Sequence, residues 1–357
     1  MRVLVTGHNG YIGSVMVPVL QAAGHEVVGL DSFFFEDCSL GVEDGPQVPA
    51  LRKDLRDVRV TDLRGFDAVA HLAALCNDPL GDLHPELTHE INHKASVQLA
   101  RMAREAGVQR FLYASSCSMY GAAGADDLLT ETAPLRPLTP YAVSKVRTEE
   151  DVSKLADTSF SPVFMRNATA YGLSPRLRAD VVLNNLVCWA HTTGRIRIMS
   201  DGTPWRPIVH VHDISRAFEA ALVAPRAAIH NQAFNVGDSG ENYQVRELAE
   251  IARATVPGCS VEYAAGAGPD PRSYRVDFAK LSRTFPDLKP RWNASFGAKD
   301  LYAALQEADV TLADFQGRRY IRLAQIRHLL DRGLLDPKLR WTATPATRDE
   351  APRATAG

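Results

Sequence analysis

The chain of 357 residues is 45% hydrophobic and 23% charged, which supplies apolar material for a packed core and excludes a largely disordered protein. Its 40 basic and 42 acidic side chains leave a formal net charge of -2, so no overall positive field attracts nucleic acid or an anionic membrane, and a small ligand is the expected partner. A chain of this length is expected to form one large α/β unit with a smaller appendage.

A βαβ unit is predicted at the N-terminus. Residues 2–6 form a short apolar run rich in β-branched side chains, and a glycine turn and a helical pattern over residues 14–23 follow it. Gly24 is typical of a helix C-cap, after which residues 26–31 predict a second buried strand that ends in an acid.

Strands and helices continue to alternate through the first half of the chain. Strands are predicted at 67–72, 110–114 and 162–166, and helices at 85–106 and 140–156. This alternation is typical of a parallel sheet with helices on both faces. The predicted fold class is therefore α/β, a doubly wound parallel sheet of the Rossmann kind.

Two domains and a tail are predicted. Residues 1–172 are expected to form the Rossmann domain that carries the catalytic residues. Residues 173–341 have a looser pattern and are expected to form mainly a smaller, mixed α/β C-terminal substrate-binding domain, with later segments returning to the first domain. Within it, residues 299–334 predict helix, and residues 342–357, rich in Thr, Ala, Pro and Arg, predict a disordered tail.

Three glycines in the first turn predict a nucleotide site. Gly7, Gly10 and Gly13 stand where a strand turns into a helix, and a helix N-terminus offers free N–H groups and a positive dipole end to a pyrophosphate. Asp31 ends the second strand, where a carboxylate can accept hydrogen bonds from an adenosine ribose and would repel the 2'-phosphate of NADP. Together they favour NAD as the cofactor, whereas the glycines alone also fit a purely structural turn.

Two later segments extend the predicted cofactor site. Asp54 and Leu55 follow the next expected strand, where the carboxylate could bond the adenine amine and the leucine could pack on the ring; Asp54 is equally consistent with a plain loop acid. Leu72, Ala73 and Ala74 end a buried strand in mostly small residues, which leave room for a cofactor but also occur in ordinary packing.

Tyr141 and Lys145 predict an acid-base pair. Thr139 and Pro140 are typical of a helix start, so the two side chains lie four residues apart and project from one helix face. An ammonium beside a phenol favours the phenolate, which lets Tyr141 act as a base near neutral pH. The same spacing also occurs between exposed side chains on ordinary helices.

Residues 114–121, with the sequence ASSCSMYG, favour the catalytic interpretation. They follow a buried strand parallel to the first, so their hydroxyl groups emerge at the carboxyl ends of the strands, where open α/β sheets bind ligands. The hydroxyls of this segment and of Tyr141 are therefore expected to share one crevice.

Four motifs together carry a resemblance to a known family. They are TGxxGYIG at 6–13, HLAA at 71–74, SSxSxYG at 115–121 and PYxxSK at 140–145. In this order and spacing they resemble the extended short-chain dehydrogenase/reductase superfamily, in its NAD-dependent nucleotide-sugar epimerase/dehydratase branch.

The resemblance assigns roles to individual residues. It implies three catalytic residues, namely Ser116 as the hydroxyl that steadies the developing carbonyl, Tyr141 as the base and Lys145 as the residue that holds the nicotinamide ribose. It adds three residues to the cofactor site: Tyr11, Ile12 and Asn92.

The resemblance also implies a nucleotide-sugar substrate. Its binding residues would be Ser116, Ser118, Thr169, Asn185, Arg206 and Arg272, and residues 166–172 and 184–185 resemble substrate-contacting segments. Two guanidinium groups on separate loops, those of Arg206 and Arg272, would form a diphosphate clamp through bidentate contacts. Each arginine alone is also consistent with an ordinary surface position.

The residues after Ser116 favour one reaction of this branch. Its 4,6-dehydratases carry an Asp-Glu pair there, whereas this chain has Cys117 and Ser118, neither of which supplies a carboxylic acid for loss of water. Cys117 is expected to be a small buried residue at a strand end. The predicted reaction is epimerisation through a transient keto-sugar, with alternatives in oxidation or reduction of a nucleotide sugar, in decarboxylation, and in a catalytically idle NAD-binding module.

The remaining predictions concern surroundings and partners. Five widely spaced cysteines without a CxxC pair indicate a reducing compartment, and with no leader or membrane-spanning pattern a cytoplasmic protein is expected. His210 and His212 lie two apart on a presumed strand and so point to opposite faces, and no metal site is expected. The resemblance implies a homodimer that pairs through four helices, including the helix of Tyr141.

Overall fold

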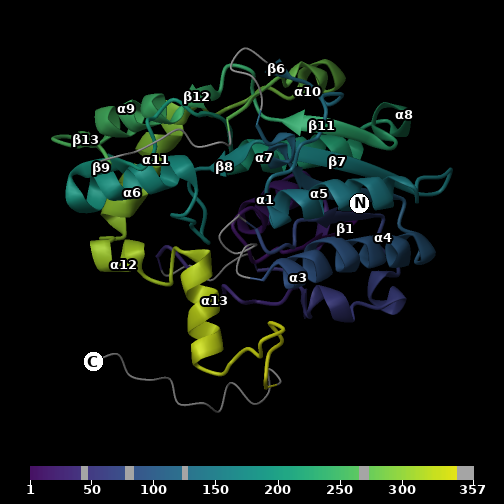
Figure 1. The fold of residues 1–357 in the computed structure, drawn as a ribbon. Coiled ribbons are helices and arrows are strands. Elements are labelled where there is room, and N and C mark those ends of the chain that lie inside the picture. The colour runs from purple at the N-terminus through teal and green to yellow at the C-terminus, as the bar shows by residue number, and fades with distance from the viewer. Residues whose placement is uncertain (42–46, 77–83, 123–127, 265–272, 344–357) are drawn as a thin grey trace.

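A seven-stranded parallel sheet forms the centre of the molecule in the computed structural model, which describes residues 1–41, 47–76, 84–122, 128–264 and 273–343 (Figure 1). In spatial order the strands are β11 (Gln232–Val236), β7 (Ser161–Asn167), β5 (Arg110–Ser116), β4 (Ala68–His71), β1 (Arg2–Thr6), β2 (Glu26–Asp31) and β3 (Ala50–Arg52). Each neighbouring pair is parallel, and the chain order reverses between β1 and β4, the position at which doubly wound sheets bind dinucleotides. The predicted α/β fold class is confirmed.

Helices cover both faces of this sheet. On one face α1 (Gly13–Ala22) and α7 (Val211–Val223) pack against each other and against the strands. On the other face lie α4 (Ala95–Glu105) and α5 (Pro140–Ser153). The strands are therefore buried on both sides, which explains why their sequences are almost continuously apolar.

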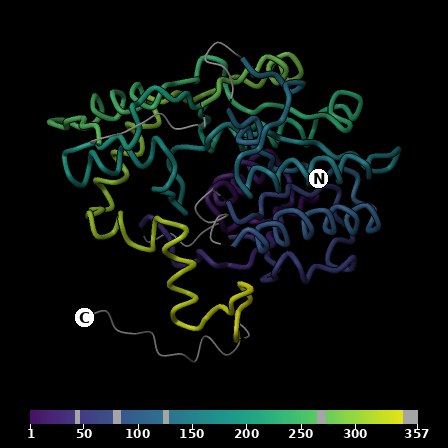
Figure 2. Tube along the Cα trace, viewed as in Figure 1, coloured from purple at the N-terminus to yellow at the C-terminus, as the bar shows by residue number. Residues whose placement is uncertain are grey.

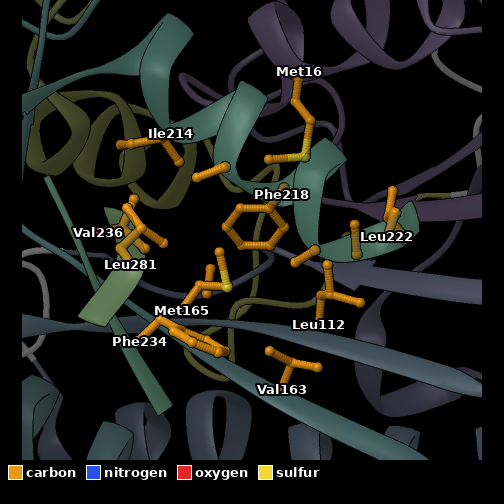
Figure 3. Packing of buried hydrophobic residues seen from close by; sticks show 14 of the residues in the cluster. Met16, Leu112, Val163, Met165, Ile214, Phe218, Leu222, Phe234, Val236 and Leu281 are labelled. Carbon is orange, nitrogen blue, oxygen red and sulfur yellow. The ribbon is translucent and has the colours of Figure 1, made fainter. Parts of the chain in front are cut away.

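Alternate side chains of one strand serve the two cores. Val3 and Val5 of β1 belong to the core under α1 and α7, whereas Leu4 belongs to the core on the opposite face. Figure 3 shows the first of these cores, where Phe218 of α7 and Met16 of α1 meet the side chains of the central strands. This two-sided burial fixes the register of the sheet, because a slip by one residue would exchange the two faces.

The helix expected over residues 85–106 contains an irregularity. It is built from α3 (Pro85–Thr88), a π-helical segment, η3 (His89–Lys94), and α4. A π-helical turn is a rare element that often accompanies a functional site, and periodicity alone does not predict it. The segment carries Asn92 inward.

A second, smaller region has its own core. The helices α6 (Val182–Thr193), α9 (Val245–Thr255) and α11 (Ala294–Glu307) pack together around it. Its short strands are β8 (Thr169–Tyr171), β9 (Arg195–Ile198), β10 (Trp205–His210), β12 (Asn242–Gln244) and β13 (Ser260–Tyr263), which form a sheet in the order β12-β10-β8 and a β13-β9 pair. The remaining elements are β6 (Leu128–Leu129), β14 (Arg275–Val276), α8 (Arg226–Ile229), α10 (Ala279–Thr284), α12 (Leu312–Gln316), α13 (Arg322–Asp331), η1 (Leu55–Asp57), η2 (Val60–Leu63) and η4 (Cys117–Tyr120).

The chain crosses between the two regions more than once. After β10 it returns to supply α7 and the edge strand β11 to the large sheet. Near its end it returns again, and α13, in yellow, extends from the second region toward the N-terminal part of the sheet domain (Figures 1 and 2). There Ile326 and Leu329 pack against Phe34 and Leu75. The predicted helix over 299–334 is thus divided into α11, α12 and α13, and of the predicted tail only Thr342 and Ala343 are described.

The placement of His210 and His212 on one strand is wrong. Strand β10 ends at His210, and His212 already belongs to α7. The ring of His210 caps that helix, because its Nδ1 accepts the N–H of His212 at 3.2 Å, and the ring stacks on Trp292 at 4.1 Å. A histidine at the end of an apolar strand resembles a strand residue in sequence, although its side chain begins the next helix.

Candidate active site

A cleft of about 890 Å³ lies at the carboxyl ends of the strands, between the sheet and the second region. It gathers most of the residues that the sequence singled out, from both regions of the chain. Among the residues that line it are Gly7, Gly10, Tyr11, Ile12, Gly13, Asp31, Asp54, Leu55, Leu72, Ala73, Ala74, Ser116, Ser118, Tyr141, Lys145, Thr169, Asn185 and Arg206. Asn92 is not among the lining residues, and Arg272 lies outside the described residues.

The glycine turn forms the floor of the cleft beside the β1–β4 switch. Gly7 has a φ of +74°, and a Cβ there would lie 2.9 Å from the backbone nitrogen of Ala73. A Cβ on Gly13 would lie 2.2 Å from the carbonyl oxygen of Gly7. Within the described residues no side chain caps the start of α1. The positive end of the helix dipole therefore faces the floor of the cleft, which fits the pyrophosphate of NAD.

Asp31 is held at the end of β2 by two backbone groups. Its carboxylate oxygens accept the N–H of Asn9 at 3.0 Å and the N–H of Phe33 at 2.7 Å. Burial raises the pKa of this carboxyl, and the two N–H groups and the neighbouring His8 oppose that rise. Each carboxylate oxygen keeps a second lone pair, which can accept from a ribose hydroxyl.

Asp54 lines the cleft and is held there by an ion pair. It caps η1 and forms a two-pronged ion pair with Arg56, with Nε to Oδ1 at 2.9 Å and Nη2 to Oδ2 at 2.7 Å. Arg56 in turn donates to the carbonyls of Lys338 and Leu339, far along the chain. The acid thus joins the cleft wall to the C-terminal segment.

The strand end of β5 and the first turns of α5 bring the three expected catalytic side chains to the same cleft. The Oγ of Ser116 accepts the N–H of Ser118 at 3.1 Å, which leaves its proton available to a ligand. Helix α5 starts at Pro140, and the Oγ1 of Thr139 caps it by accepting the N–H of Ala142 at 3.2 Å. The cap fixes the first turn, on which Tyr141 lies.

Lys145 is almost completely buried, with 3% of its surface exposed. Its Nζ donates to the carbonyl of Ala114 at 2.6 Å and lies 5.5 Å from the centre of the Tyr141 ring. Burial lowers the pKa of this lysine to about 8, since the charged form loses its water. The ammonium is therefore present at neutral pH, close to its titration range and close to the phenol.

Helix α5 is tied to the sheet by a buried ion pair. The guanidinium of Arg166 on β7 contacts both carboxylate oxygens of Glu149, and the Nη2 to Oε2 distance is 2.7 Å. Its Nη1 donates to the Tyr120 hydroxyl at 3.1 Å. Arg166, which begins a segment that resembles substrate contacts, therefore anchors the catalytic helix and does not line the cleft.

Asn92 is buried and does not line the cleft. It is 1% exposed, and its side chain bonds both backbone groups of Leu75, accepting the N–H at 2.7 Å and donating to the carbonyl at 2.9 Å. Its own carbonyl accepts from the Thr148 hydroxyl of α5. The π-helical turn thus holds the segment after β4 against the catalytic helix, so Asn92 orders the site through Leu75.

Cys117 and Ser118 differ in their environment. Cys117 is fully buried, with its thiol 3.1 Å from the carbonyl oxygen of Arg166, and burial raises its pKa, so it is a packed thiol and no acid-base group. The Oγ of Ser118 is buried in the cleft wall and has no hydrogen-bond partner among the described residues, and the same holds for the Oδ1 of Asn167. Such orphaned polar atoms fit a polar ligand.

The far wall comes from the second region. It carries Thr169 on β8, Asn185 on α6 and Arg206 on β10. The amide of Asn185 donates to the carbonyl of Ala179 at 2.9 Å, and the Nη1 of Arg206 donates to the carbonyl of Trp205 at 2.8 Å. Arg206 therefore borders the cleft, and Arg272, the other arginine of the expected clamp, lies outside the described residues.

Five charged residues of the cleft were not predicted from the sequence. They are Lys53, Arg178, Asp180, Arg197 and Arg322. Arg178 and Asp180 form an ion pair within one loop, with Nε to Oδ1 at 2.8 Å. No local pattern indicates Arg322, because it reaches the cleft through the return of α13.

Two further findings concern the part of the chain that is described. In it no helix combines the length and the apolar character that a membrane crossing demands. Nor do three or more His, Cys, Asp or Glu side chains gather there in a way that could hold a metal ion.

Comparison with known proteins defines the class of this fold and site. The model of the NAD dependent epimerase/dehydratase family matches residues 3–237, about two thirds of the chain, so the protein belongs to that family. NAD is accordingly its cofactor, and the glycine turn with Asp31 fits that cofactor.

Among individual proteins of similar sequence are UDP-glucose 4-epimerases. A UDP-glucose 4-epimerase of Mycolicibacterium smegmatis is 34% identical over 263 residues, which is 70% of this chain and 80% of the relative. A UDP-glucose 4-epimerase of Corynebacterium glutamicum is 29% identical over 274 residues, covering 71% and 80%.

Solved structures with a similar fold contain NAD. MoeE5 in complex with UDP-glucuronic acid and NAD has a TM-score of 0.74 at 27% identity, covering 86% of this chain and all of MoeE5. The UDP-glucose 4-epimerase of Thermus thermophilus with NAD has a TM-score of 0.72 at 26% identity, covering 86% and 99%.

Proposed function

We propose that the protein is an NAD-dependent nucleotide-sugar epimerase, which oxidises one sugar hydroxyl to a ketone and re-reduces it from the opposite face. The observation that carries this proposal is the convergence of Ser116, Tyr141 and Lys145 on the cleft that also contains the glycine turn. The volume of about 890 Å³ has room for a cofactor and a nucleotide sugar together. The epimerases among the relatives support the same choice.

We assign the proton transfer to Tyr141. Its phenolic oxygen accepts the proton of the reacting hydroxyl, and the ammonium of Lys145 stabilises the phenolate. The Oγ–H of Ser116 donates to the same sugar oxygen, where negative charge develops. NAD, when bound, supplies the acceptor and later the donor of the hydride.

The substrate contacts are proposed on the far wall. Thr169 and Asn185, which line this wall, would bond the sugar and the nucleotide, and the guanidinium of Arg206 would supply a positive charge for the diphosphate. Ser118, whose hydroxyl lacks a partner among the described residues, is a further sugar contact. By resemblance Arg272 completes the clamp. The relatives favour a UDP-hexose, since UDP-glucose stands in their names.

Elimination of water has little support in this site. Cys117 packs against the carbonyl of Arg166 with its pKa raised, and Ser118 carries no acidic group, so these two positions offer no general acid. Oxidoreduction with release of the ketone, or decarboxylation, would use the same Tyr141. These reactions are distinguished by their products.

The test is to incubate the purified protein with UDP-glucose, UDP-galactose and UDP-glucuronic acid in separate reactions and follow them by NMR and at 340 nm. We expect an inverted stereocentre in at least one sugar, without accumulation of NADH. Accumulated NADH, released carbon dioxide or a 6-deoxy keto-sugar would each contradict epimerisation, and an inert protein that still binds NAD would indicate a binding module.

We further propose a cytoplasmic homodimer that pairs through α4 and α5. The five cysteines are free thiols, which suits a reducing compartment, and the two helices lie next to each other on one face of the sheet. Light scattering after gel filtration should give twice the mass of the chain, 39.1 kDa. A mass equal to one chain at micromolar concentration would contradict the pairing.

A further inference from the structure

Two arginines of the cleft have guanidinium nitrogens without a partner. Arg178 and Arg322 both line the cleft and are 8% and 2% exposed. Neither the Nη2 of Arg178 nor the Nη1 of Arg322 has a hydrogen-bond partner among the residues that the structure describes. Buried N–H groups of a cation are rarely left unsatisfied, so their position in a ligand cleft indicates an anion that completes them.

Of the two positive charges on Arg178 and Arg322, only one is neutralised by an ion pair. Asp180 neutralises Arg178 through the ion pair of their loop. Arg322 has no salt bridge within the described ranges; its Nη2 donates to the carbonyl of Arg176 at 2.6 Å, and its guanidinium lies 4.5 Å above the ring of Phe35. Burial and the charge of Arg178 lower the pKa of Arg322, as expected for a cation that lacks a counterion.

Hydrogen bonds place Arg322 beside the glycine turn. Arg176, whose carbonyl holds Arg322, donates its Nε to the Oδ1 of Asn9 within that turn at 2.9 Å. One helical turn farther along α13, Gln325 donates to the carbonyl of Phe34 at 3.0 Å, just beyond β2. Helix α13 is thus fixed to the two segments between which the phosphates of a dinucleotide pass, the glycine turn and the end of β2.

We propose that Arg322 and Arg178 bind the pyrophosphate of NAD, so that the C-terminal helix retains the cofactor through both halves of the reaction. This inference rests on the proposed function, because it requires NAD to lie across the glycine turn. Arg322 stands outside the 3–237 range that the family model matches, so this contact is an addition made by the C-terminal part of this chain.

The test measures nucleotide binding rather than turnover. Full-length protein freed of nucleotide is titrated with NAD, with ADP-ribose, which keeps the pyrophosphate, and with adenosine, which lacks it. We expect Arg322→Gln to weaken NAD and ADP-ribose by about tenfold or more, the effect of losing a charge-assisted hydrogen bond, and to leave adenosine unchanged. Arg322→Lys keeps the charge, so its affinity for NAD should lie between those of Arg322→Gln and the unsubstituted protein. Arg327→Gln, an exposed arginine of the same helix, is the matched control and should equal the unsubstituted protein.

Three results separate the possibilities. Unchanged NAD affinity in Arg322→Gln overturns the inference, as does a variant that binds NAD normally but binds UDP-glucuronic acid more weakly, since the anion would then belong to the sugar. If Arg322→Gln does not fold, Arg178→Gln takes its place with the same expectation and the same failure. Absence of NAD binding in the unsubstituted protein would instead overturn the proposed function.

Discussion

At the residue scale, the phenol of Tyr141 owes its proposed reactivity to a neighbour that water barely reaches. The ammonium of Lys145 is buried under the ring of Tyr113, with Nζ 4.6 Å from the ring centre, and it is oriented by the carbonyl of Ala114. A desolvated positive charge acts on a neighbouring phenol more strongly than an exposed one does. The ammonium of Lys145 thus supplies the positive charge that the proposed phenolate of Tyr141 requires.

The first prediction concerns the base itself. Tyr141→Phe removes the proton acceptor and should lower kcat by at least about 100-fold, because general base catalysis typically contributes that much. NAD content, measured by absorbance after denaturation, should stay at the level of the unsubstituted protein, since the ring remains in the cleft wall. A variant that turns over normally would contradict the role of Tyr141.

The second prediction concerns pH. Because burial lowers the pKa of Lys145 to about 8, its ammonium is present below that pH and is lost above it. The rate should therefore fall as pH rises through about 8. A profile of kcat/KM from pH 6 to 10 checks this. Lys145→Arg keeps the charge at all these values, so its residual activity should lack the alkaline decline.

At the element scale, helix α5 must hold two catalytic side chains in register with a strand end. Thr139 caps the helix, Pro140 starts it and the Glu149–Arg166 pair fixes its third turn to β7. The cap and the start were predictable because they depend on neighbouring residues in the chain. The ion pair and the π-helical turn at Asn92 were not, since each depends on contacts across the fold.

A third prediction follows from the anchor. Glu149→Gln leaves the buried guanidinium of Arg166 without its counterion and should lower the free energy of unfolding by about 3–5 kcal/mol, measured by urea denaturation. The matched control is Glu150→Gln, an exposed neighbour on the same helix, which should change stability by less than about 0.5 kcal/mol. Equal stability of the two variants would show that the pair does not anchor α5.

At the scale of the whole molecule, two histidines in different regions are kept neutral. His71 lies between the hydroxyls of Thr6 and Ser96, and His210 lies against Trp292; burial lowers the pKa of each to about 3. Because these pKa values lie below the usual 6.5, both histidines bind a proton in the unfolded chain at pH values where they remain neutral in the folded protein. The stability that depends on them is complete above pH 6.5 and is lost as pH falls toward 3.

The fourth prediction uses that difference. Each histidine should reduce the free energy of unfolding by about 2 kcal/mol on going from pH 7 to pH 5. His71→Gln cannot titrate at this position. Between pH 7 and pH 5 its free energy of unfolding should therefore fall by about 2 kcal/mol less than that of the unsubstituted protein, as measured by urea denaturation at each pH. Parallel curves for the two proteins would mean that His71 has the same pKa in the folded protein as in the unfolded chain.

The sequence predicts the sheet far better than the boundaries of the cleft. Alternating strands and helices imply parallel pairing, and parallel pairing brings Gly7, Asp31 and Ser116 to one edge, so most of the expected residues meet. Arg178 and Arg322 escaped notice because they lie 144 positions apart in the chain, as their numbers show, and only the return of α13 unites them. Contacts of that span leave no periodic trace in a sequence.

The bonds from Arg56 to Lys338 and Leu339 also set an order of events during synthesis. The ribosome releases the strands of the central sheet early, whereas these two carbonyls follow more than 280 residues after Arg56. The wall beside Asp54 acquires its final partners only when nearly the entire chain has emerged. With Arg322 in its proposed role, α13 also comes late, so nascent chains halted before α13 should form the central sheet but bind the dinucleotide only weakly.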